Sequence, residues 1–283
     1  MQRILVTGAT GFIGKPLVEQ LQAGGAEVFP VSSRNGDIAD PETWNSFESA
    51  NFVIHLAART FVPDSWIAPN SFLKTNYFGT ACALDYCRKH KSKLIFISSY
   101  LYGNPESLPI SEDAKIYANN PYTFSKIMAE ESCRFYTENY GVNVSILRPF
   151  NVYGPGQNED FLIPSIIRQI MAGKPVHVKD LYPKRDYVYV QDIIDAIIKS
   201  ISLTENFNVI NIGTGKSHSV KEVIGIIQAA LGTNTKILSS FERRPGEVMD
   251  TQADISKAQK ILGWLPIWTL EQGIAKMIET YKK

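Results

Sequence analysis

The chain has 283 residues, of which 44% are hydrophobic and 20% are charged, so it is long enough for one large domain and a smaller lobe. This composition excludes a disordered chain, a collagen-like repeat and a disulfide-stapled scaffold. With 29 basic and 28 acidic residues, the formal net charge of +1 creates no overall field that would attract nucleic acid or an anionic membrane. Any bound anion must be held by local groups.

The cysteines and the N-terminus point to a reducing compartment. Cys82, Cys87 and Cys133 are an odd number without zinc-ligand spacing, which fits reduced thiols. Residues 4–6 are too short an apolar run for a signal peptide, and no window reaches about 18 apolar residues. We expect a cytoplasmic protein that binds neither a metal nor a membrane.

Short β-branched runs alternate with helical patterns through most of the chain. Strands are predicted at 4–7, 27–32, 52–56, 93–98, 143–147 and 209–212, and helices at 15–23, 76–88, 121–140 and 192–202. Strands that alternate with helices predict a parallel sheet covered on both faces, with crossovers of one hand. The fold class is therefore α/β, a Rossmann-like doubly wound sheet.

Helical patterns predominate in the rest of the chain, at residues 162–171, 220–231, 255–262 and 270–282, with an extended segment at 176–178. We expect a main domain of residues 1–160 that also receives roughly residues 186–214. Residues 161–185 and 215–283 are expected to form a smaller, mostly helical substrate lobe.

A glycine-rich turn follows the first predicted strand and begins the first helix. Residues 7–14 read TGATGFIG, and strand before and helix after are the setting that a dinucleotide-binding turn requires. Glycines allow a tight turn and close approach of a pyrophosphate, which the free N–H groups of a helix N-terminus then bind. The alternative is an ordinary strand-to-helix turn. The predicted contacts to NAD(P) are Gly8, Thr10, Gly11, Phe12, Ile13 and Gly14.

The end of the second strand distinguishes NAD from NADP. A carboxylate there would bind the ribose 2′-hydroxyl of NAD, but residues 32–35 read SSRN and contain no acid. Hydroxyls and a forked guanidinium suit a 2′-phosphate, so Ser33 and Arg34 predict NADPH, with NADH possible. A solvated loop charge is the alternative for Arg34. Pro30 conflicts with a central position for this strand.

A tyrosine and a lysine stand four residues apart at the start of a predicted helix. Residues 121–126 read PYTFSK, which places Tyr122 and Lys126 on one helix face. A neighbouring cation and the positive helix end favour the phenolate, so we expect the pKa of Tyr122 to lie below its usual value of about 10. The alternative is an ordinary Tyr/Lys pair on a helix surface.

These segments, together with FISSYLYG at residues 96–103, resemble the extended short-chain dehydrogenase/reductase family, including its GxxGxxG spacing. The resemblance implies a catalytic triad of Ser98, Tyr122 and Lys126, with Ser99 as a supporting substrate contact. It implies hydride transfer at a sugar carbon, in which Tyr122 exchanges the proton, Ser98 polarises the carbonyl and Lys126 binds the nicotinamide ribose. Further implied cofactor contacts, beside Tyr122 and Lys126, are Asp37, Ile38, Leu56, Ala57, Ala58, Asn76 and Phe150.

Resemblance to the nucleotide-sugar branch of that family, the NAD-dependent epimerases and dehydratases, extends over nearly the whole chain. RPFNVYGPG at residues 148–156 resembles a motif whose asparagine, here Asn151, contacts substrate. Segments 185–190 and 244–247 resemble the two arginine segments that clamp a nucleoside diphosphate, which implies substrate contacts by Arg185, Arg244 and Glu247. Surface ion pairs are the alternative for the arginines. A glutamate at this position, here Glu247, resembles the residue that the GDP-linked members of the branch carry.

A departure from the branch pattern narrows the reaction. Ser99 and Tyr100 stand where dehydratases of the branch carry acids, so 4,6-dehydration is not expected. The chain resembles GDP-4-keto-6-deoxy-sugar 4-reductases of the GDP-rhamnose or GDP-6-deoxy-heptose type, which implies NADPH-dependent 4-keto reduction for cell-surface polysaccharide (lipopolysaccharide) synthesis. The alternatives are an NAD-dependent nucleotide-sugar 4-epimerase and a non-catalytic NAD(P)-binding regulatory module.

Three weaker patterns remain. GTGKS at residues 213–217 lacks the first glycine of a phosphate-binding loop, since Ile210 stands there, so we expect a plain loop after a strand. His177 and His218 lack metal-ligand spacing with any partner. In family homodimers the helices at 76–88 and 121–140 would pack as a four-helix bundle, so we expect a homodimer. The apolar side chains of these helices, which include Phe78, Leu84 and Phe135, are explained equally well by packing on the sheet.

Overall fold

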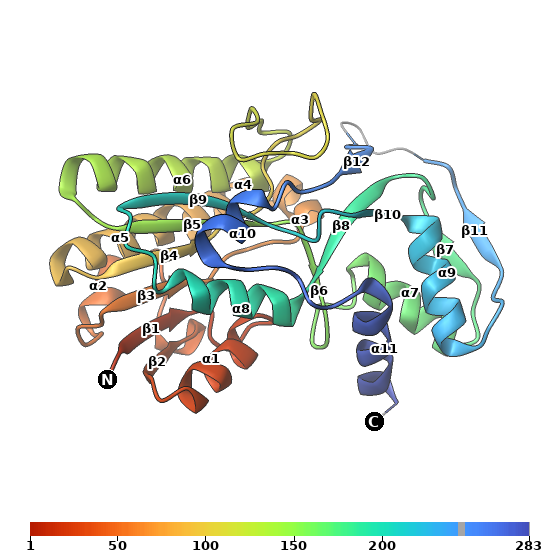
Figure 1. The fold of residues 1–283 in the computed structure, drawn as a ribbon, viewed down its shortest axis with the longest axis horizontal. Coiled ribbons are helices and arrows are strands. Elements are labelled where there is room, and N and C mark those ends of the chain that lie inside the picture. The colour runs from red at the N-terminus through yellow and green to blue at the C-terminus, as the bar shows by residue number, and fades with distance from the viewer. Residues whose placement is uncertain (243–246, 283) are drawn as a thin grey trace.

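The computed structural model describes residues 1–242 and 247–282. Six parallel strands form its central sheet in the order β2-β1-β3-β4-β5-β9 (Figure 1). They are β1 (Arg3–Thr7), β2 (Glu27–Val31), β3 (Phe52–His55), β4 (Lys93–Ile97), β5 (Val144–Pro149) and β9 (Phe207–Ile212). The strand order reverses between β1 and β3, and ligands of doubly wound folds bind outside the carboxyl ends of the strands at this point. The predicted fold class is confirmed.

Helices cover both faces of the sheet (Figure 1). One face carries α1 (Gly14–Ala23) and α8 (Val190–Ser200), and the other carries α2 (Pro41–Asn45), α5 (Gly79–His90) and α6 (Pro121–Tyr140). Successive side chains of β1 alternate between the two apolar clusters: Ile4 and Val6 pack with α1, whereas Leu5 packs with α5. A strand that is buried on both faces reads as a continuous apolar run, which is why β1 shows no polar alternation.

The connection from β3 to α5 contains more helix than the sequence predicts. It consists of α3 (Val62–Ile67), α4 (Pro69–Phe72) and a π-helical turn η2 (Leu73–Phe78), which runs directly into α5. The predicted start at residue 76 is therefore wrong by several residues. Pro69 is the reason, because a proline at the first helical position suits a helix start and moves it upstream. A 3₁₀ turn, η1 (Ser33–Asn35), follows β2.

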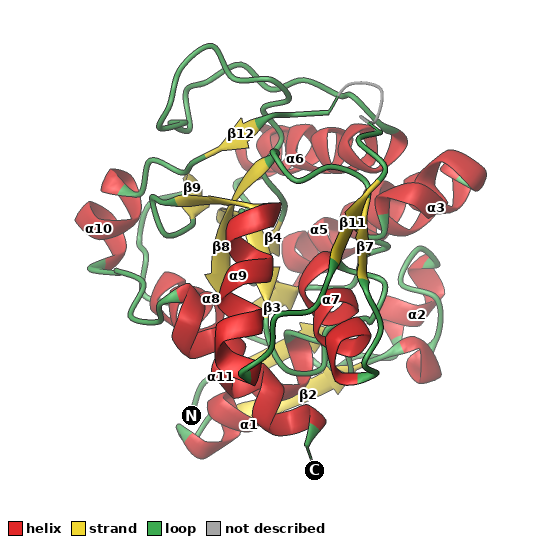
Figure 2. Cartoon of the chain, turned by 90° about the vertical axis from the view of Figure 1, so that its right-hand side faces the viewer, coloured by secondary structure: helices red, strands yellow, loops and turns green. Residues whose placement is uncertain are grey.

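The smaller lobe contains short strands as well as helices (Figures 1 and 2). Its helices are α7 (Leu162–Met171), α9 (Val220–Leu231) and α11 (Leu270–Tyr281), and α10 (Ser256–Leu262) packs near β9. Strand β8 (Lys184–Tyr189) pairs with β6 (Asn151–Tyr153), β10 (Ser217–Ser219) and β12 (Asp250–Thr251), while β7 (Val176–Val178) pairs with β11 (Ile237–Ser239). The sequence analysis foresaw only the extended segment at β7. The division into two domains stays a prediction.

Two sequence features find their explanation in the sheet. Within the described residues, strand β2 is an edge strand that pairs only with β1, so Pro30 interrupts no ladder on its outer side. Cys87 and Cys133 are buried free thiols between α5 and α6, and Cys82 is partly buried. No helix in the described part of the chain is long and apolar enough to span a membrane.

Candidate active site

The glycine turn lies against the end of β3. Gly8 has a φ of +69°, and a Cβ atom there would stand 2.9 Å from the Ala57 nitrogen. A Cβ atom on Gly14 would stand 2.1 Å from the Gly8 carbonyl oxygen, and the Gly11 N–H donates to that same oxygen at 2.9 Å. The first turn of α1 has neither a capping side chain nor an acidic residue. Its N–H groups therefore suit an anion such as a dinucleotide pyrophosphate.

A buried polar group fixes the segment opposite the glycine turn. The Thr7 hydroxyl accepts a hydrogen bond from the Ala57 N–H at 3.2 Å and lies 2.8 Å from His55 Nδ1. Burial, and then the charge of Lys126, lower the pKa of His55 to about 3, so its imidazole is neutral. The predicted cofactor contacts Leu56, Ala57 and Ala58 follow directly and are partly exposed.

The end of β2 presents a small exposed turn. Ser32 and Asn35 form a capping box around η1, which leaves Ser33 and Arg34 exposed. Asp37 pairs with Lys74 at 2.8 Å, and that hydrogen bond lowers the pKa of Asp37. The side chain of the predicted neighbour Ile38 is buried against Gly79, where a Cβ atom would lie 2.8 Å from the Ile38 Cδ1 atom, and its contact with a cofactor stays a prediction. Among the predicted groups of this turn, Arg34 is the exposed cation.

Helix α6 brings the predicted triad to the carboxyl end of β4. Asn120 caps the helix by accepting the Thr123 N–H at 2.8 Å, which fixes Tyr122 in its first turn. One turn further, the Lys126 Nζ donates to the Ile97 carbonyl at 2.7 Å and lies 4.1 Å from the centroid of the Phe96 ring. Ser98 follows Ile97, and its hydroxyl is buried without a hydrogen-bond partner in the described chain. A buried hydroxyl without a partner is suited to a substrate oxygen.

The electrostatics of the triad differ from the sequence-based expectation. Burial raises the pKa of Tyr122 to about 12, although a hydrogen bond with Ser99 acts in the opposite direction. Burial also lowers the pKa of Lys126 to about 7, against the effect of Glu130. The expected lowering of the Tyr122 pKa is therefore wrong for the chain by itself, because desolvation outweighs the helix end and the Lys126 amine is bonded to the Ile97 carbonyl.

Asn76 and Phe150 have other partners. The Asn76 carboxamide accepts the Arg59 N–H at 2.8 Å, donates to the Arg59 carbonyl at 3.0 Å and donates to the Ser125 hydroxyl at 2.9 Å. Phe150 is 4% exposed, and its ring centroid lies 5.5 Å from that of Tyr100. Both border the site, and their direct contact with a cofactor stays a prediction.

The predicted substrate residues meet on β6 and β8. Asn151 is paired in register with Tyr187, and its side chain donates to the Asp186 carbonyl at 3.4 Å. The Arg185 guanidinium forms an ion pair with Glu247 and donates to the Val248 carbonyl at 2.6 Å. The side chains of Arg185 and Glu247 are only 15% and 17% exposed. The predicted contact Arg244 lies outside the described residues.

Asp186 is a structurally important residue that the sequence analysis missed. Its buried carboxylate accepts bonds from the Thr214 N–H and hydroxyl, both at 2.7 Å, the Gly215 N–H at 2.9 Å and the Ala253 N–H at 3.1 Å. The prediction that residues 213–217 are not a phosphate loop is confirmed, because these donors hold the protein's own carboxylate. The available signal was an aspartate directly before the apolar run at residues 187–190.

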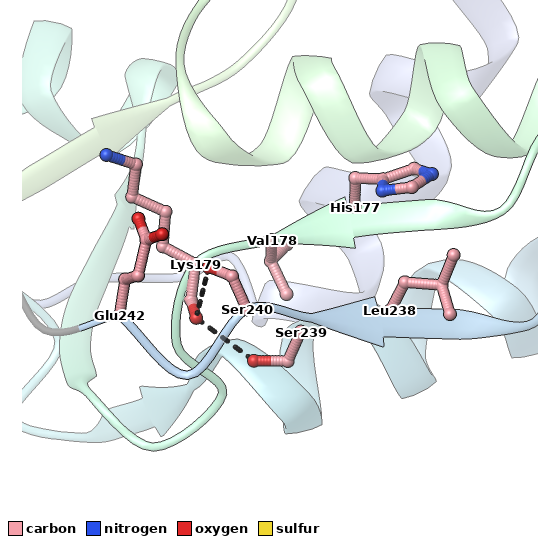
Figure 3. A pocket seen from close by; sticks show the side chains of 7 residues that line it. All are labelled: His177, Val178, Lys179, Leu238, Ser239, Ser240 and Glu242. Carbon is pink, nitrogen blue, oxygen red and sulfur yellow. Dashed lines mark hydrogen bonds between the residues drawn. The ribbon is translucent and has the colours of Figure 1, made fainter.

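An open pocket of about 450 Å³ lies on the β7–β11 pair (Figure 3). Its lining residues are His177, Val178, Lys179, Leu238, Ser239, Ser240 and Glu242. The Ser239 and Ser240 hydroxyls both donate to the Lys179 carbonyl, at 3.0 and 3.4 Å. None of the predicted site residues lines this pocket. His177 has no metal-binding companions, and no group of metal ligands was found among the described residues.

Comparison with known proteins identifies the family. Residues 4–213 match the model of the NAD dependent epimerase/dehydratase family. A putative UDP-glucose 4-epimerase of Methanocaldococcus jannaschii is 33% identical, over 99% of this chain and 98% of its own length. The GDP-6-deoxy-D-mannose reductase of Pseudomonas aeruginosa is 31% identical, over 99% of this chain and 97% of its own.

Solved structures agree with the sequence matches. The UDP-glucose 4-epimerase of Thermotoga maritima, solved with UDP-glucose, has a TM-score of 0.94 and 29% identity over 99% of this chain and 98% of its own. RMD of Pseudomonas aeruginosa, complexed with NADPH, has a TM-score of 0.92 and 28% identity over 100% and 99%. The chain belongs to the NAD dependent epimerase/dehydratase family, in the nucleotide-sugar branch of the extended short-chain dehydrogenases/reductases.

Proposed function

We propose that this enzyme uses NADPH to reduce the 4-keto group of a GDP-linked 4-keto-6-deoxy sugar, with NADH as a possible substitute. The observation that carries the proposal is the end of β2, where Arg34 is exposed on a capped turn and residues 32–35 include no carboxylate. A forked cation suits a 2′-phosphate, and a reductase must exchange its cofactor in every turnover. Two similar proteins support this assignment: one is a GDP-6-deoxy-D-mannose reductase, and the other is a solved structure in complex with NADPH.

The surroundings of the triad argue against dehydration. That reaction needs an acid beside the catalytic hydroxyl to protonate the departing group. Ser99 is instead hydrogen-bonded to Tyr122, and the Tyr100 ring stacks on Phe150. Reduction needs only a hydride donor, a proton donor and a group that polarises the carbonyl.

The bound cofactor would supply the hydride to C4 of the sugar, and the chain's own residues would complete the reaction. The free Ser98 hydroxyl donates to the carbonyl oxygen and polarises it. Tyr122 gives its proton to that oxygen as the new C–H bond forms, which yields the alcohol and the oxidised cofactor. Because burial holds its pKa at about 12, Tyr122 is protonated at neutral pH, as a proton donor must be. Lys126 would bind the nicotinamide ribose.

The nucleoside diphosphate would bind at the Arg185 side of the lobe, with Arg244 proposed as a second cation. Arg185 is occupied by Glu247 in the chain alone, so a diphosphate must draw the guanidinium away from that carboxylate or share it. Asn151 is paired with Tyr187, two residues after Arg185 along β8, and would contact the sugar.

A nucleotide-sugar 4-epimerase is the second candidate, because epimerases are among the relatives at the highest identity and TM-score given above. An epimerase first oxidises its substrate, so Tyr122 must accept a proton before it returns one. The Arg34 turn, which suits a cofactor that is exchanged in every turnover, favours reduction over this reaction. The complete triad argues against a non-catalytic module.

Absorbance separates the two reactions. The purified protein is incubated with NADPH and GDP-4-keto-6-deoxymannose, and then with UDP-glucose in the absence of added cofactor. Net NADPH oxidation with the first substrate supports reduction. Co-purified NAD, with formation of UDP-galactose and no net oxidation, would establish the epimerase instead. Thermal-shift ranking of GDP, UDP, CDP and dTDP identifies the base, since a ligand that binds only the folded state raises the melting temperature.

We also propose a homodimer formed through α6, α5 and the end of η2, which runs into α5. Phe78 and Phe135 are 55% and 53% exposed on this face, so they are available to a second copy, whereas Leu84 is buried against the sheet. Of the two explanations given for Leu84, a dimer contact or packing on the sheet, its burial therefore supports packing on the sheet. Sedimentation velocity of wild type and of a Phe78→Lys, Phe135→Lys variant tests the proposal: a monomeric wild type would contradict it.

A further inference from the structure

A buried ion pair joins the catalytic helix to the end of β5. The Arg148 guanidinium donates to the Glu130 carboxylate through Nη2 at 2.6 Å and through Nε at 3.1 and 3.2 Å. The side chains of Arg148 and Glu130 are 6% and 5% exposed. Although burial would lower the pKa of Arg148, the bond to Glu130 raises it, so the guanidinium is charged.

The network continues to the segment that follows β4. Arg148 Nη1 donates to the Tyr102 hydroxyl at 2.9 Å, and that hydroxyl donates to Asn211 Oδ1 on β9 at 2.6 Å. Asn211 Nδ2 in turn donates to the Ile110 carbonyl at 2.9 Å. Tyr102 is 2% exposed, and the Arg148 guanidinium also lies 5.2 Å from the centroid of its ring.

These residues link the two segments that carry the proposed triad, which are the segment after β4 with Ser98 and helix α6 with Tyr122 and Lys126. Glu130 lies one helical turn after Lys126, and Tyr102 lies four residues after Ser98. The Ser98 N–H itself donates to the Leu147 carbonyl at 2.8 Å, immediately before Arg148. Three contacts at the end of β5 therefore fix the spacing between the serine segment and α6.

We propose that Glu130, Arg148 and Tyr102 form a positioning device that holds Ser98 at its working distance from Tyr122 and Lys126. The same device supplies the Glu130 carboxylate, whose negative charge stabilises the Lys126 ammonium one helical turn away. This inference rests on the proposed function for the role of the triad. A buried ion pair contributes little to stability compared with an apolar pair of the same shape, so stability alone does not account for it. Hydrogen bonds that join α6, β5, β9 and the segment after β4 give it a geometric role instead.

The groups around Lys126 are consistent with an electrostatic effect of Glu130. On α6, Lys126 is faced by Glu130 and Cys133; from β3 it is faced by His55 and from β4 by the Phe96 ring. Burial raises the pKa of Cys133 well above its usual value and lowers that of His55 to about 3, so neither is charged at neutral pH. Glu130 raises the pKa of Lys126, against burial.

The first test removes one hydroxyl from the network. Tyr102→Phe keeps the ring over Arg148 but deletes two hydrogen bonds, and the control Tyr86→Phe deletes the bond from a buried tyrosine to the Glu48 carbonyl at the other end of the sheet. We expect Tyr102→Phe to lower kcat about tenfold at unchanged KM for the sugar nucleotide, because a small misplacement of Ser98 weakens only the chemical step. The control keeps its kcat. Equal kcat in the two variants would overturn the positioning role.

The second test measures Lys126 without any turnover. Glu130→Met combined with Arg148→Met removes the pair without leaving a buried charge, so the variant is expected to fold. In cofactor-free protein labelled with 13C-lysine, the Lys126 resonance should titrate at lower pH in this variant than in wild type, and Lys126→Arg assigns the resonance. An unchanged titration would overturn the electrostatic role. Because this readout needs no substrate, it decides the inference even if no sugar nucleotide is reduced and the proposed function fails.

Discussion

Replacing Gly14 with alanine should damage cofactor binding more than it damages the fold. A Cβ atom at this position would stand 2.1 Å from the Gly8 oxygen and 2.9 Å from both the Gly8 carbonyl carbon and the Ala9 Cα. Ordinary contact begins at 3.4 Å, so the turn must open by about 1.3 Å. All three neighbours are backbone atoms, which cannot rotate aside as the end of a side chain would. The substitution must therefore displace the N–H groups that are proposed to bind the pyrophosphate.

The size of the effect follows from that displacement. Overpacking of this kind costs about 1–3 kcal/mol of stability. Moving anion-binding donors by an ångström removes their short, charge-assisted bonds, so we expect the Kd for NADPH to rise about 10- to 100-fold. Quenching of intrinsic fluorescence gives the Kd, and urea unfolding without cofactor gives the free energy of unfolding separately.

Gly24→Ala is the matched control at the other end of α1. Its Cβ atom would meet the Leu21 and Gln20 carbonyl oxygens at 3.4 and 3.5 Å, and the Gly24 φ of −76° suits alanine. This variant should bind NADPH as wild type does. If Gly14→Ala also binds NADPH within about threefold of wild type, the turn does not hold the pyrophosphate and the reasoning is refuted.

Three further variants test the chemistry, the cofactor and the buried imidazole. Tyr122→Phe should lower kcat at least about 100-fold through loss of the proton donor while leaving the NADPH Kd unchanged, measured by turnover and by fluorescence. Arg34→Ala should raise the KM for NADPH about 10- to 100-fold and leave that for NADH nearly constant, in steady-state assays with both cofactors. The unfolded chain binds a proton at His55 near pH 6.5, whereas the folded chain binds it only at about pH 3. The free energy of unfolding should therefore fall by about 2 kcal/mol from pH 7 to pH 5, and His55→Asn should remove that dependence in urea titrations.

Controls for these variants are available in the same chain. Tyr140→Phe changes an exposed tyrosine at the end of α6 and should leave kcat unaltered. His177→Asn changes an exposed imidazole and should leave the acid dependence of wild type in place. Loss of NADH activity in Arg34→Ala to the same extent as NADPH activity would show that Arg34 supports the fold of the turn and does not bind a 2′-phosphate.

Local patterns predicted the sheet because its strands are buried on both faces, and they predicted best the helix whose two ends are clearly marked. The helix from Pro121 to Tyr140 was predicted with its observed bounds, since a proline at its start and Gly141 after its end mark both. Strand β8 was missed, because its polar first half, Lys184 to Asp186, does not read as a strand. Its partners β6, β10 and β12 are two or three residues long and are separated from it in sequence, so no local window contains the pairing.

Which residues share a helix face can be predicted from spacing, but the partner of a charge on another element cannot. The separation of Tyr122 and Lys126 placed them together, and the structure brings both to the end of β4. Whether the pKa of Tyr122 is raised or lowered depends instead on two things. One is whether the Lys126 amine reaches the phenol or the Ile97 carbonyl, and the other is how deeply the first turn of α6 is buried. The same holds for Arg185, which the resemblance identified as a residue that binds a diphosphate. In the structure it is paired with Glu247, 62 residues later in the chain. The proposed binding of a diphosphate at Arg185 would consequently require this arginine to exchange Glu247 for the ligand. Glu247→Gln should therefore change diphosphate affinity as well as the stability of the lobe.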